Sequence, residues 1–132
     1  MALPVKAKEI AVEVKNKPGA GAAVLAVLAD AKVNLKAFNG YAQTKSKGRL
    51  LFVPEDYAAA SKALKKAKIK YAASDVVLVD LANKPGAMAE ACAKLAAKNI
   101  NIDYAYAVAA TKKSALAVFR APGPAKVIKA LS

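Results

Sequence analysis

The sequence predicts an α+β protein made of two copies of one unit, in which antiparallel strands carry helices on one face. Two observations lead to this fold class. A five-residue motif, Asn16-Lys17-Pro18-Gly19-Ala20, recurs as Asn83-Lys84-Pro85-Gly86-Ala87, a shift of 85 − 18 = 67 positions. In each copy the apolar spacing changes from every second residue to every third or fourth, which indicates a strand followed by a helix.

Further matches at the same shift show that the duplication extends beyond the motif. They are Val33-Asn34-Leu35 with Ile100-Asn101-Ile102, Thr44-Lys45 with Thr111-Lys112, and Phe52 with Phe119. Several matches in one register, without gaps, are hard to obtain by chance. We therefore expect two repeats, over residues 1–74 and 75–132.

The first predicted element of each repeat is a strand. Ile10, Val12 and Val14 alternate with less apolar residues, the pattern of a half-buried strand. Its counterpart over 76–81 is more uniformly apolar, which predicts deeper burial. The Asn-Lys-Pro-Gly motif follows each strand. Proline suits a turn or the first position of a helix, and glycine allows close approach to the backbone.

A helix comes next in each repeat. Val24, Val27, Leu28 and Ala31 form one apolar face of the first helix. In the second repeat the same face is formed by Met88, Cys92, Leu95 and Ala96. Cys92 therefore lies on an apolar stripe, where we expect a buried and inert thiol.

The remaining elements complete a βαββαβ plan. Strands are predicted over 33–41 and 49–53, and over 100–108 and 115–120, with a polar turn inside each pair. A second helix follows each pair, and Glu55 and Asp56 suit its first N-terminus. A closing strand is visible once, over 69–72. For the second repeat we expect Leu3 to Lys6, or a neighbouring subunit, to cover that edge. This plan is ferredoxin-like, with both helices on one face of an antiparallel sheet.

Composition argues against catalysis. The chain has no His, one Cys and nine scattered acidic residues, so His-based triads and His- or Cys-cluster metal sites are excluded. We expect no enzyme activity, no cofactor and no metal. The sequence has no apolar run long enough to span a bilayer and no secretory signal pattern, and a lone Cys fits a reducing compartment. We therefore expect no membrane association and a cytoplasmic location.

The net charge of +13 raises nucleic-acid binding as an alternative function. RNA-recognition sheets place stacking aromatic residues on central strands, but Arg49 stands where such a residue belongs. The lysines between residues 62 and 70 are typical of a solvated helix face. Nucleic acid is therefore the less favoured partner.

These residues resemble the ACT domain family. The resemblance rests on the strand ending in Asn-Lys-Pro-Gly-Ala, and on Lys98-Asn99-Ile100-Asn101-Ile102-Asp103-Tyr104-Ala105-Tyr106 after the helix. It extends from about Lys8 to Leu131 and is greatest to small proteins of two tandem ACT repeats. The resemblance implies regulatory binding of a free amino acid near the loop between the first strand and first helix, a homodimer, and a possible regulated enzyme.

Backbone chemistry agrees with that location, because a helix N-terminus offers unpaired N–H groups to a carboxylate. The predicted ligand-binding residues are Asn16, Pro18, Gly19, Ala20, Asn34, Asn83, Pro85, Gly86, Ala87, Met88 and Asn101. The asparagines of the motif equally suit turns and caps. We expect the second strand to run beside the loop, so Asn34 and Asn101 are candidates for ligand contact, although a bracing role is favoured for them.

The two repeats differ in how well they match the family. Family members carry Leu or Met two residues after the motif glycine, so Met88 matches and Gly21 does not. A third alternative is a purely structural module that forms dimers and whose ligand loops are vestigial. The sequence alone leaves the amino acid and the occupied loop open.

Overall fold

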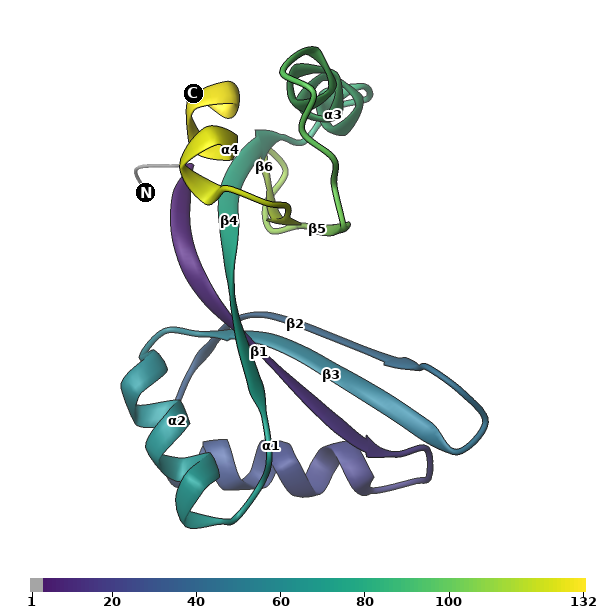
Figure 1. The fold of residues 1–132 in the computed structure, drawn as a ribbon, viewed down its shortest axis with the longest axis vertical. Helices are drawn as coiled ribbons and strands as arrows, with labels where there is room; N and C mark the ends of the chain where they lie inside the picture. Colours follow the sequence, from purple (N-terminus) through teal and green to yellow (C-terminus); the bar gives the residue numbers. More distant parts are fainter. Residues whose placement is uncertain (1–3) are drawn as a thin grey trace. The chain divides into compact units, whose positions relative to one another are not determined.

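The structure is a computed structural model that describes residues 4–132 (Figure 1). The chain forms two compact units. The first unit is Lys8–Ser74, and the second is residues 4–7 with Asp75–Ser132. The elements in chain order are β1 (Val5–Lys15), α1 (Ala20–Asp30), β2 (Leu35–Ala42), β3 (Lys47–Pro54), α2 (Tyr57–Lys66), β4 (Ala72–Ala82), α3 (Ala87–Ala97), β5 (Tyr104–Ala109), β6 (Ser114–Arg120) and α4 (Pro124–Leu131). The predicted α+β class is confirmed.

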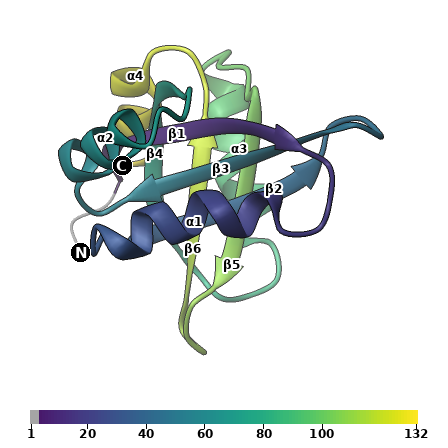
Figure 2. The ribbon, with the colours of Figure 1, turned by 90° about the horizontal axis from the view of Figure 1, so that it is seen from below.

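The first unit is an antiparallel sheet covered by two helices. Strand β3 pairs with β1 on one side and β2 on the other, with Ile10 opposite Phe52. Helices α1 and α2 lie on the same face of these strands (Figures 1 and 2). Its buried core consists of Ile10, Val12, Val24, Leu28, Leu50, Phe52, Ala60 and Leu64. The predicted alternation of β1 therefore has its expected cause, since every second side chain faces the helices.

The second unit repeats this arrangement. Strand β6 pairs with β4 and β5, and Val77 lies opposite Phe119. Val77 and Phe119 are the positions of Ile10 and Phe52 shifted by 67. Residues that match in the sequence repeat therefore also occupy equivalent places in the two sheets. Its buried core consists of Val77, Val79, Ala91, Leu95, Ala117, Phe119, Ala121 and Val127. Cys92 packs against that core, as expected for an apolar stripe, but it is half-buried and not buried as predicted.

The second helices of the two units start differently. The side chain of Asp56 accepts a hydrogen bond from the Ala59 amide at 3.0 Å and caps α2, which confirms the predicted capping role. In α4, Gly123 occupies the cap position and Pro124 begins the helix. Proline at that position loses no helical hydrogen bond, because the first N–H groups of a helix lack partners inside it.

Two predicted strands differ from the structure. The strand predicted over 100–108 begins only at Tyr104, because Ile100 and Ile102 turn toward the second core instead of pairing. The closing strand predicted over 69–72 is wrong as a separate element. Ile69 and Tyr71 pack against the first core outside any strand, and Ala72 is the first residue of β4.

Strands β1 and β4 each contribute residues to both units. Residues 5–7 of β1 belong to the second unit, and residues 72–74 of β4 belong to the first. The segment Leu3 to Lys6 was one candidate to cover the open edge of the second repeat. Residues 4–7 do belong to the second unit, whereas Leu3 lies outside the described residues.

Replacing Gly21 by Ala should raise the free energy of unfolding by about 0.5–1 kcal/mol, because glycine inside a helix is less favourable than alanine. Gly21 is the second residue of α1, and a Cβ there would lie at an ordinary contact distance of 3.6 Å from Leu50. Urea denaturation measures the change. Gly40→Ala is the control, because its Cβ would crowd Leu50 at 3.3 Å and should give no gain. A loss of stability in Gly21→Ala would contradict the described start of α1.

Candidate functional site

The loop between strand and helix has the same geometry in both units. The carbonyl of Lys17 accepts a hydrogen bond from the Ala20 amide at 3.3 Å, and Lys84 and Ala87 form the same bond at 3.3 Å. Gly19 has φ 86° and ψ −13°, and Gly86 has φ 89° and ψ −10°. These bonds and angles define a type II turn, which requires a positive φ at its third residue and favours proline at its second.

The turn decides which amides are free at the two helix starts. Pro18 and Pro85 stand inside the turn and not at the first helical position, and the amides of Ala20 and Ala87 are used by the turn bond. The next amides are those of Gly21 and Ala22 in the first unit and of Met88 and Ala89 in the second. Within the described chain these four donate no hydrogen bond, so each helix start keeps two adjacent N–H donors.

The motif asparagines hold this loop against a neighbouring hairpin. Nδ2 of Asn16 donates to the carbonyls of Thr44 and Lys45 at 3.1 and 3.2 Å. Nδ2 of Asn83 donates to the Thr111 carbonyl at 2.9 Å. Neither side chain caps its helix, because the cap residues are Gly19 and Gly86. Capping is therefore not their structural role, and Oδ1 of each amide accepts no hydrogen bond from the described residues.

Thr44 and Thr111 belong to the same loop architecture, although sequence reasoning did not single them out as site residues. Oγ1 of Thr44 accepts from the amides of Ser46 and Lys47, at 3.2 and 2.9 Å. Oγ1 of Thr111 accepts from Lys113 and Ser114, at 3.1 and 2.9 Å. These bonds fix the hairpin turn whose backbone carbonyls accept hydrogen bonds from the asparagine side chain. The repeat of Thr-Lys at the 67-residue shift was the signal that could have found them.

Asn34 and Asn101 are not brought to the loop of their own unit, and the expected proximity is wrong. The carbonyl of Asn34 accepts from the Glu55 amide at 2.9 Å, next to the start of β2, where Leu35 lies opposite Pro54. The Asn16 loop lies at the other end of the sheet, because Lys15 is opposite Lys47. Asn101 has the corresponding place before β5. Strand β2 does run toward the hairpin, but its first residue is the one farthest from it.

A groove of about 210 Å³ lies beside the loop of the second unit, although Asn83, Met88 and Ala89 are not among its lining residues. It is lined by Val79, Asp80, Leu81, Ala82, Lys84, Ala87, Glu90, Ala91, Lys94 and Leu131. Strand β4, the loop and the first two turns of α3 supply most of this lining, and Leu131 comes from the end of α4. The groove combines an apolar floor with carboxylates and ammonium groups, which suits a small ligand that carries both charges.

The charges around the two loops differ. In the first unit Glu13 pairs with Lys47, with 4.0 Å between Oε2 and Nζ. Its counterpart Asp80 makes no ion pair with a described residue, because Ser114 replaces the lysine. The second helix start also carries Glu90, which pairs with Lys94 at 4.0 Å across one turn. The second loop therefore has a carboxylate that remains available for a cationic group.

The aromatic residues are not placed as in an RNA-binding sheet. Tyr104 and Tyr106 lie on β5, which among residues 4–132 pairs with β6 alone and is an edge strand. The Arg120 guanidinium lies 5.9 Å from the centre of the Tyr104 ring. In the first unit the central strand β3 carries Arg49 at the position discussed above. The nucleic-acid alternative gains no support from this arrangement.

No group of three or more His, Cys, Asp or Glu side chains is arranged to hold a metal ion in residues 4–132. Over the same residues, none of the helices has both the length and the apolar character required to span a bilayer.

One family model matches nearly the whole chain. Residues 5–131 match a family model described as an ACT domain pair. Protein BT0572 from Bacteroides thetaiotaomicron is 32% identical, with a TM-score of 0.88 over 97% of this chain and 88% of that chain.

The regulatory subunit of aspartate kinase from Thermus flavus is 20% identical, with a TM-score of 0.69 over 98% of this chain and 89% of that chain. Its ligand-free Thermus thermophilus counterpart is 17% identical, with a TM-score of 0.68 over 97% and 91%. At these identities the two Thermus structures show a shared fold. No curated protein matches the sequence significantly.

Proposed function

Because this chain belongs to the ACT domain pair family, we propose that it binds a free amino acid reversibly and regulates a partner, without catalysing a reaction itself. Each compact unit corresponds to one ACT repeat in this proposal. The observation that carries it is the duplicated loop, in which a type II turn leaves two adjacent helix amides free beside a fixed asparagine. The regulatory subunits that share the fold support a regulatory role.

The second loop is the proposed site. The ligand's α-carboxylate binds the free amides of Met88 and Ala89, where the helix dipole favours negative charge. Its α-ammonium binds Asp80, a residue of the groove lining that makes no ion pair with a described residue. Oδ1 of Asn83 is a second acceptor for the ammonium group, because its Nδ2 is already held by Thr111.

In this proposal, regulation follows from the position of the site between β4, the loop that follows it and α3. A ligand that bridges β4 and the start of α3 fixes their relative position and so changes the surface offered to a partner. We propose that the chain forms a homodimer and that a partner enzyme responds to the change of this surface. Light scattering with and without ligand tests the homodimer.

Isothermal titration calorimetry against the twenty standard amino acids should identify at least one ligand. Asp80→Asn should weaken its binding by about tenfold, since a hydrogen bond to a charged group contributes about 1.5–3 kcal/mol. The matched control is Glu13→Gln, the same change at the equivalent position of the first unit, and it should leave binding unaltered.

The outcomes distinguish amino-acid binding itself from the choice of the loop that holds the ligand. No binding by any of the amino acids, with no ligand-induced shift in melting temperature, would overturn amino-acid sensing. Binding that Glu13→Gln weakens and Asp80→Asn does not would place the ligand at the first loop.

A further inference from the structure

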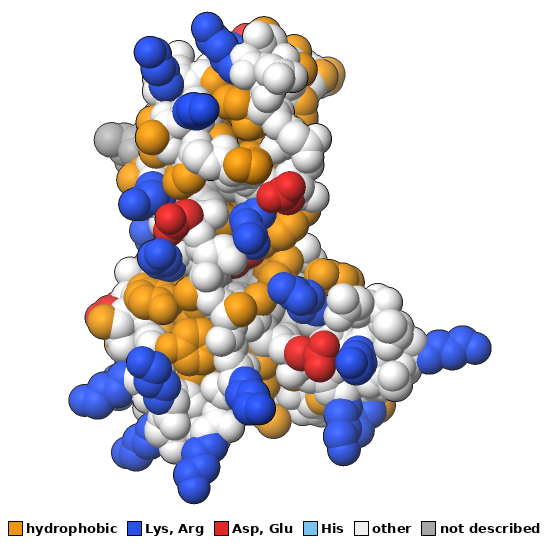
Figure 3. Space-filling view, in the orientation of Figure 1, with side chains coloured by type: hydrophobic (Ala, Val, Ile, Leu, Met, Phe, Trp, Pro, Cys, Tyr) orange, Lys and Arg blue, Asp and Glu red, His pale blue; other side chains and the backbone are white. Residues whose placement is uncertain are grey.

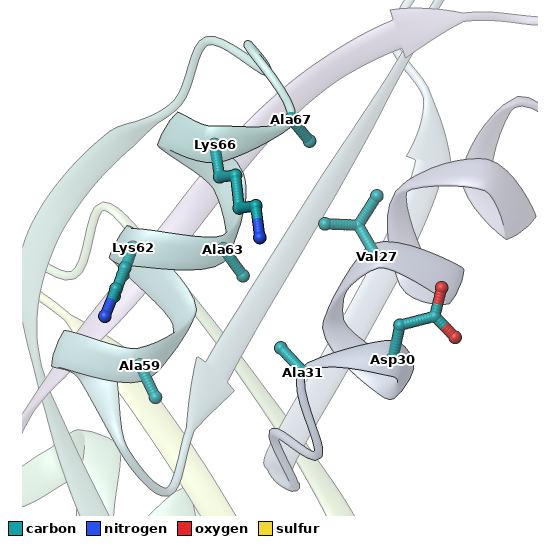
Figure 4. Close-up of a pocket in the computed structure, with 8 residues that line it drawn as sticks. All are labelled: Val27, Asp30, Ala31, Ala59, Lys62, Ala63, Lys66 and Ala67. Carbon is teal, nitrogen blue, oxygen red and sulfur yellow. The ribbon is translucent and has the colours of Figure 1, made fainter.

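A second groove lies between the two helices of the first unit, away from the loop. It has a volume of about 560 Å³ and is lined by Val27, Asp30, Ala31, Ala59, Lys62, Ala63, Lys66 and Ala67. Figure 4 shows Ala59 and Ala63 pointing from α2 toward α1, with Val27 pointing back from α1. Because the facing side chains are mostly methyl groups, the helices leave an apolar channel between them.

The rim of this groove on α2 is cationic. Lys62 and Lys66 are one helical turn apart, and neither makes an ion pair with a described residue. Residues 57–70 contain five lysines and no acidic residue. In Figure 3 Lys and Arg side chains gather over the part of the surface that α2 forms. Asp30 on the α1 side is the one acidic residue among those that line the groove, so the two lysines leave the lining with a net positive charge.

The second unit has a groove at the equivalent place. It has a volume of about 290 Å³ and is lined by Lys98, Ile100, Lys126, Lys129 and Ala130. Shifted back by 67, four of these five positions, namely 31, 59, 62 and 63, line the first groove. Lys62 and Lys129 are equivalent, as are Ala63 and Ala130. A helix-pair groove with lysine in its lining is therefore a feature of both repeats, but only the first is lined mainly by alanine, because Lys98 and Lys126 replace Ala31 and Ala59 in the second.

We propose that the groove between α1 and α2 docks an acidic amphipathic helix of a partner protein. Apolar side chains of that helix fill the alanine-lined channel, and its Asp or Glu residues pair with Lys62 and Lys66. Because lysines four residues apart lie on one helix face, they match carboxylates at the same spacing on the partner. This docking surface is separate from the loop and stands whether or not an amino acid binds there.

The chemistry of the groove favours a peptide helix over nucleic acid. Phosphates would use the lysines but would leave the methyl-lined channel unfilled. An amphipathic helix uses both parts of the surface, since burial of its apolar face supplies affinity and its carboxylates supply orientation and fast association. The alanine floor also lets a helix backbone approach closely.

Fluorescence anisotropy with a labelled synthetic helix tests the proposal. The probe is a peptide of about 18 residues, with leucine along one face and glutamate beside it at i, i+4 spacing. The full chain should bind this probe, and binding should weaken with added salt. A peptide with each glutamate replaced by lysine should not bind.

Variants of the chain locate the interaction. The double variant Lys62→Glu/Lys66→Glu should weaken probe binding by about tenfold or more, since two attractive pairs become repulsive. Lys36→Glu/Lys45→Glu, the same charge change at exposed lysines of the same unit that do not line this groove, should change it far less. Ala63→Leu, which fills the channel, should abolish binding, whereas Ala58→Leu on the exposed side of α2 should not.

Circular dichroism shows that each variant is folded before it is used. The proposal is overturned if the probe does not bind, or if the groove variants and their controls bind equally. It is also overturned if a single-stranded RNA binds through Lys62 and Lys66 and Ala63→Leu has no effect, because that pattern would assign the lysines to nucleic acid.

Discussion

Phe119→Ala is expected to lower the free energy of unfolding by about 3–5 kcal/mol, the usual cost of removing a buried aromatic ring. The Phe119 side chain is fully buried on β6, opposite Val77 on β4, and belongs to the second core. Its removal loses apolar burial and leaves a cavity that closely packed neighbours fill only in part. Urea denaturation, followed by circular dichroism, measures the loss.

Phe52→Ala provides an internal replicate, because Phe52 is also fully buried, opposite Ile10 in the first core. It should cost a similar amount. Phe38→Ala is the control, since Phe38 on the edge strand β2 is 44% exposed and its loss should cost less than about 1 kcal/mol. Equal, small effects for all three variants would contradict the described cores.

Gly86→Ala is expected to destabilise the protein by about 1–3 kcal/mol and to weaken amino-acid binding. Gly86 has φ 89°, a conformation that costs about this much for a residue with a side chain. A Cβ at Gly86 would meet no atom within 4 Å. The cost therefore comes from backbone strain and not from a clash. Relief of that strain rotates the turn and moves the free amides of Met88 and Ala89.

Gly19→Ala is the matched variant, with φ 86° and an equally open surrounding. Both variants should lose similar stability in urea, while calorimetry should show weaker binding only for Gly86→Ala. Equal loss of binding would mean that both loops hold ligand. Unchanged stability in both variants would contradict the type II turn.

The sequence predicted the duplication and the local elements because both depend on neighbouring residues. Apolar alternation in β1 and helical spacing in α1 require no knowledge of distant contacts. Asp56 was recognised as a cap from its position before an Ala- and Lys-rich helix, and the structure confirms it. The family was recognised from the repeated Asn-Lys-Pro-Gly-Ala and its strand–helix context, and the matching family model confirms it.

The site was predicted only in part. The turn and the free helix amides follow from Pro18, Gly19 and their copies, since proline and glycine fix the local backbone. The partners of Asn16 lie 28 and 29 residues away in a hairpin, so no local pattern indicated them. The expected place of Asn34 beside the loop was wrong, because the hairpin, and not the start of β2, reaches the loop.

The sequence by itself determined that the chain is a duplicated β-α-β-β-α protein with two glycine turns at its helix starts, because composition, period and turn chemistry are local properties. Only the tertiary structure decided that Asp80 makes no ion pair with a described residue, that residues 5–7 belong to the second unit, and that α1 and α2 leave a lysine-rimmed groove. These features depend on which distant residues meet. That is set by strand register and helix packing, which no single segment specifies.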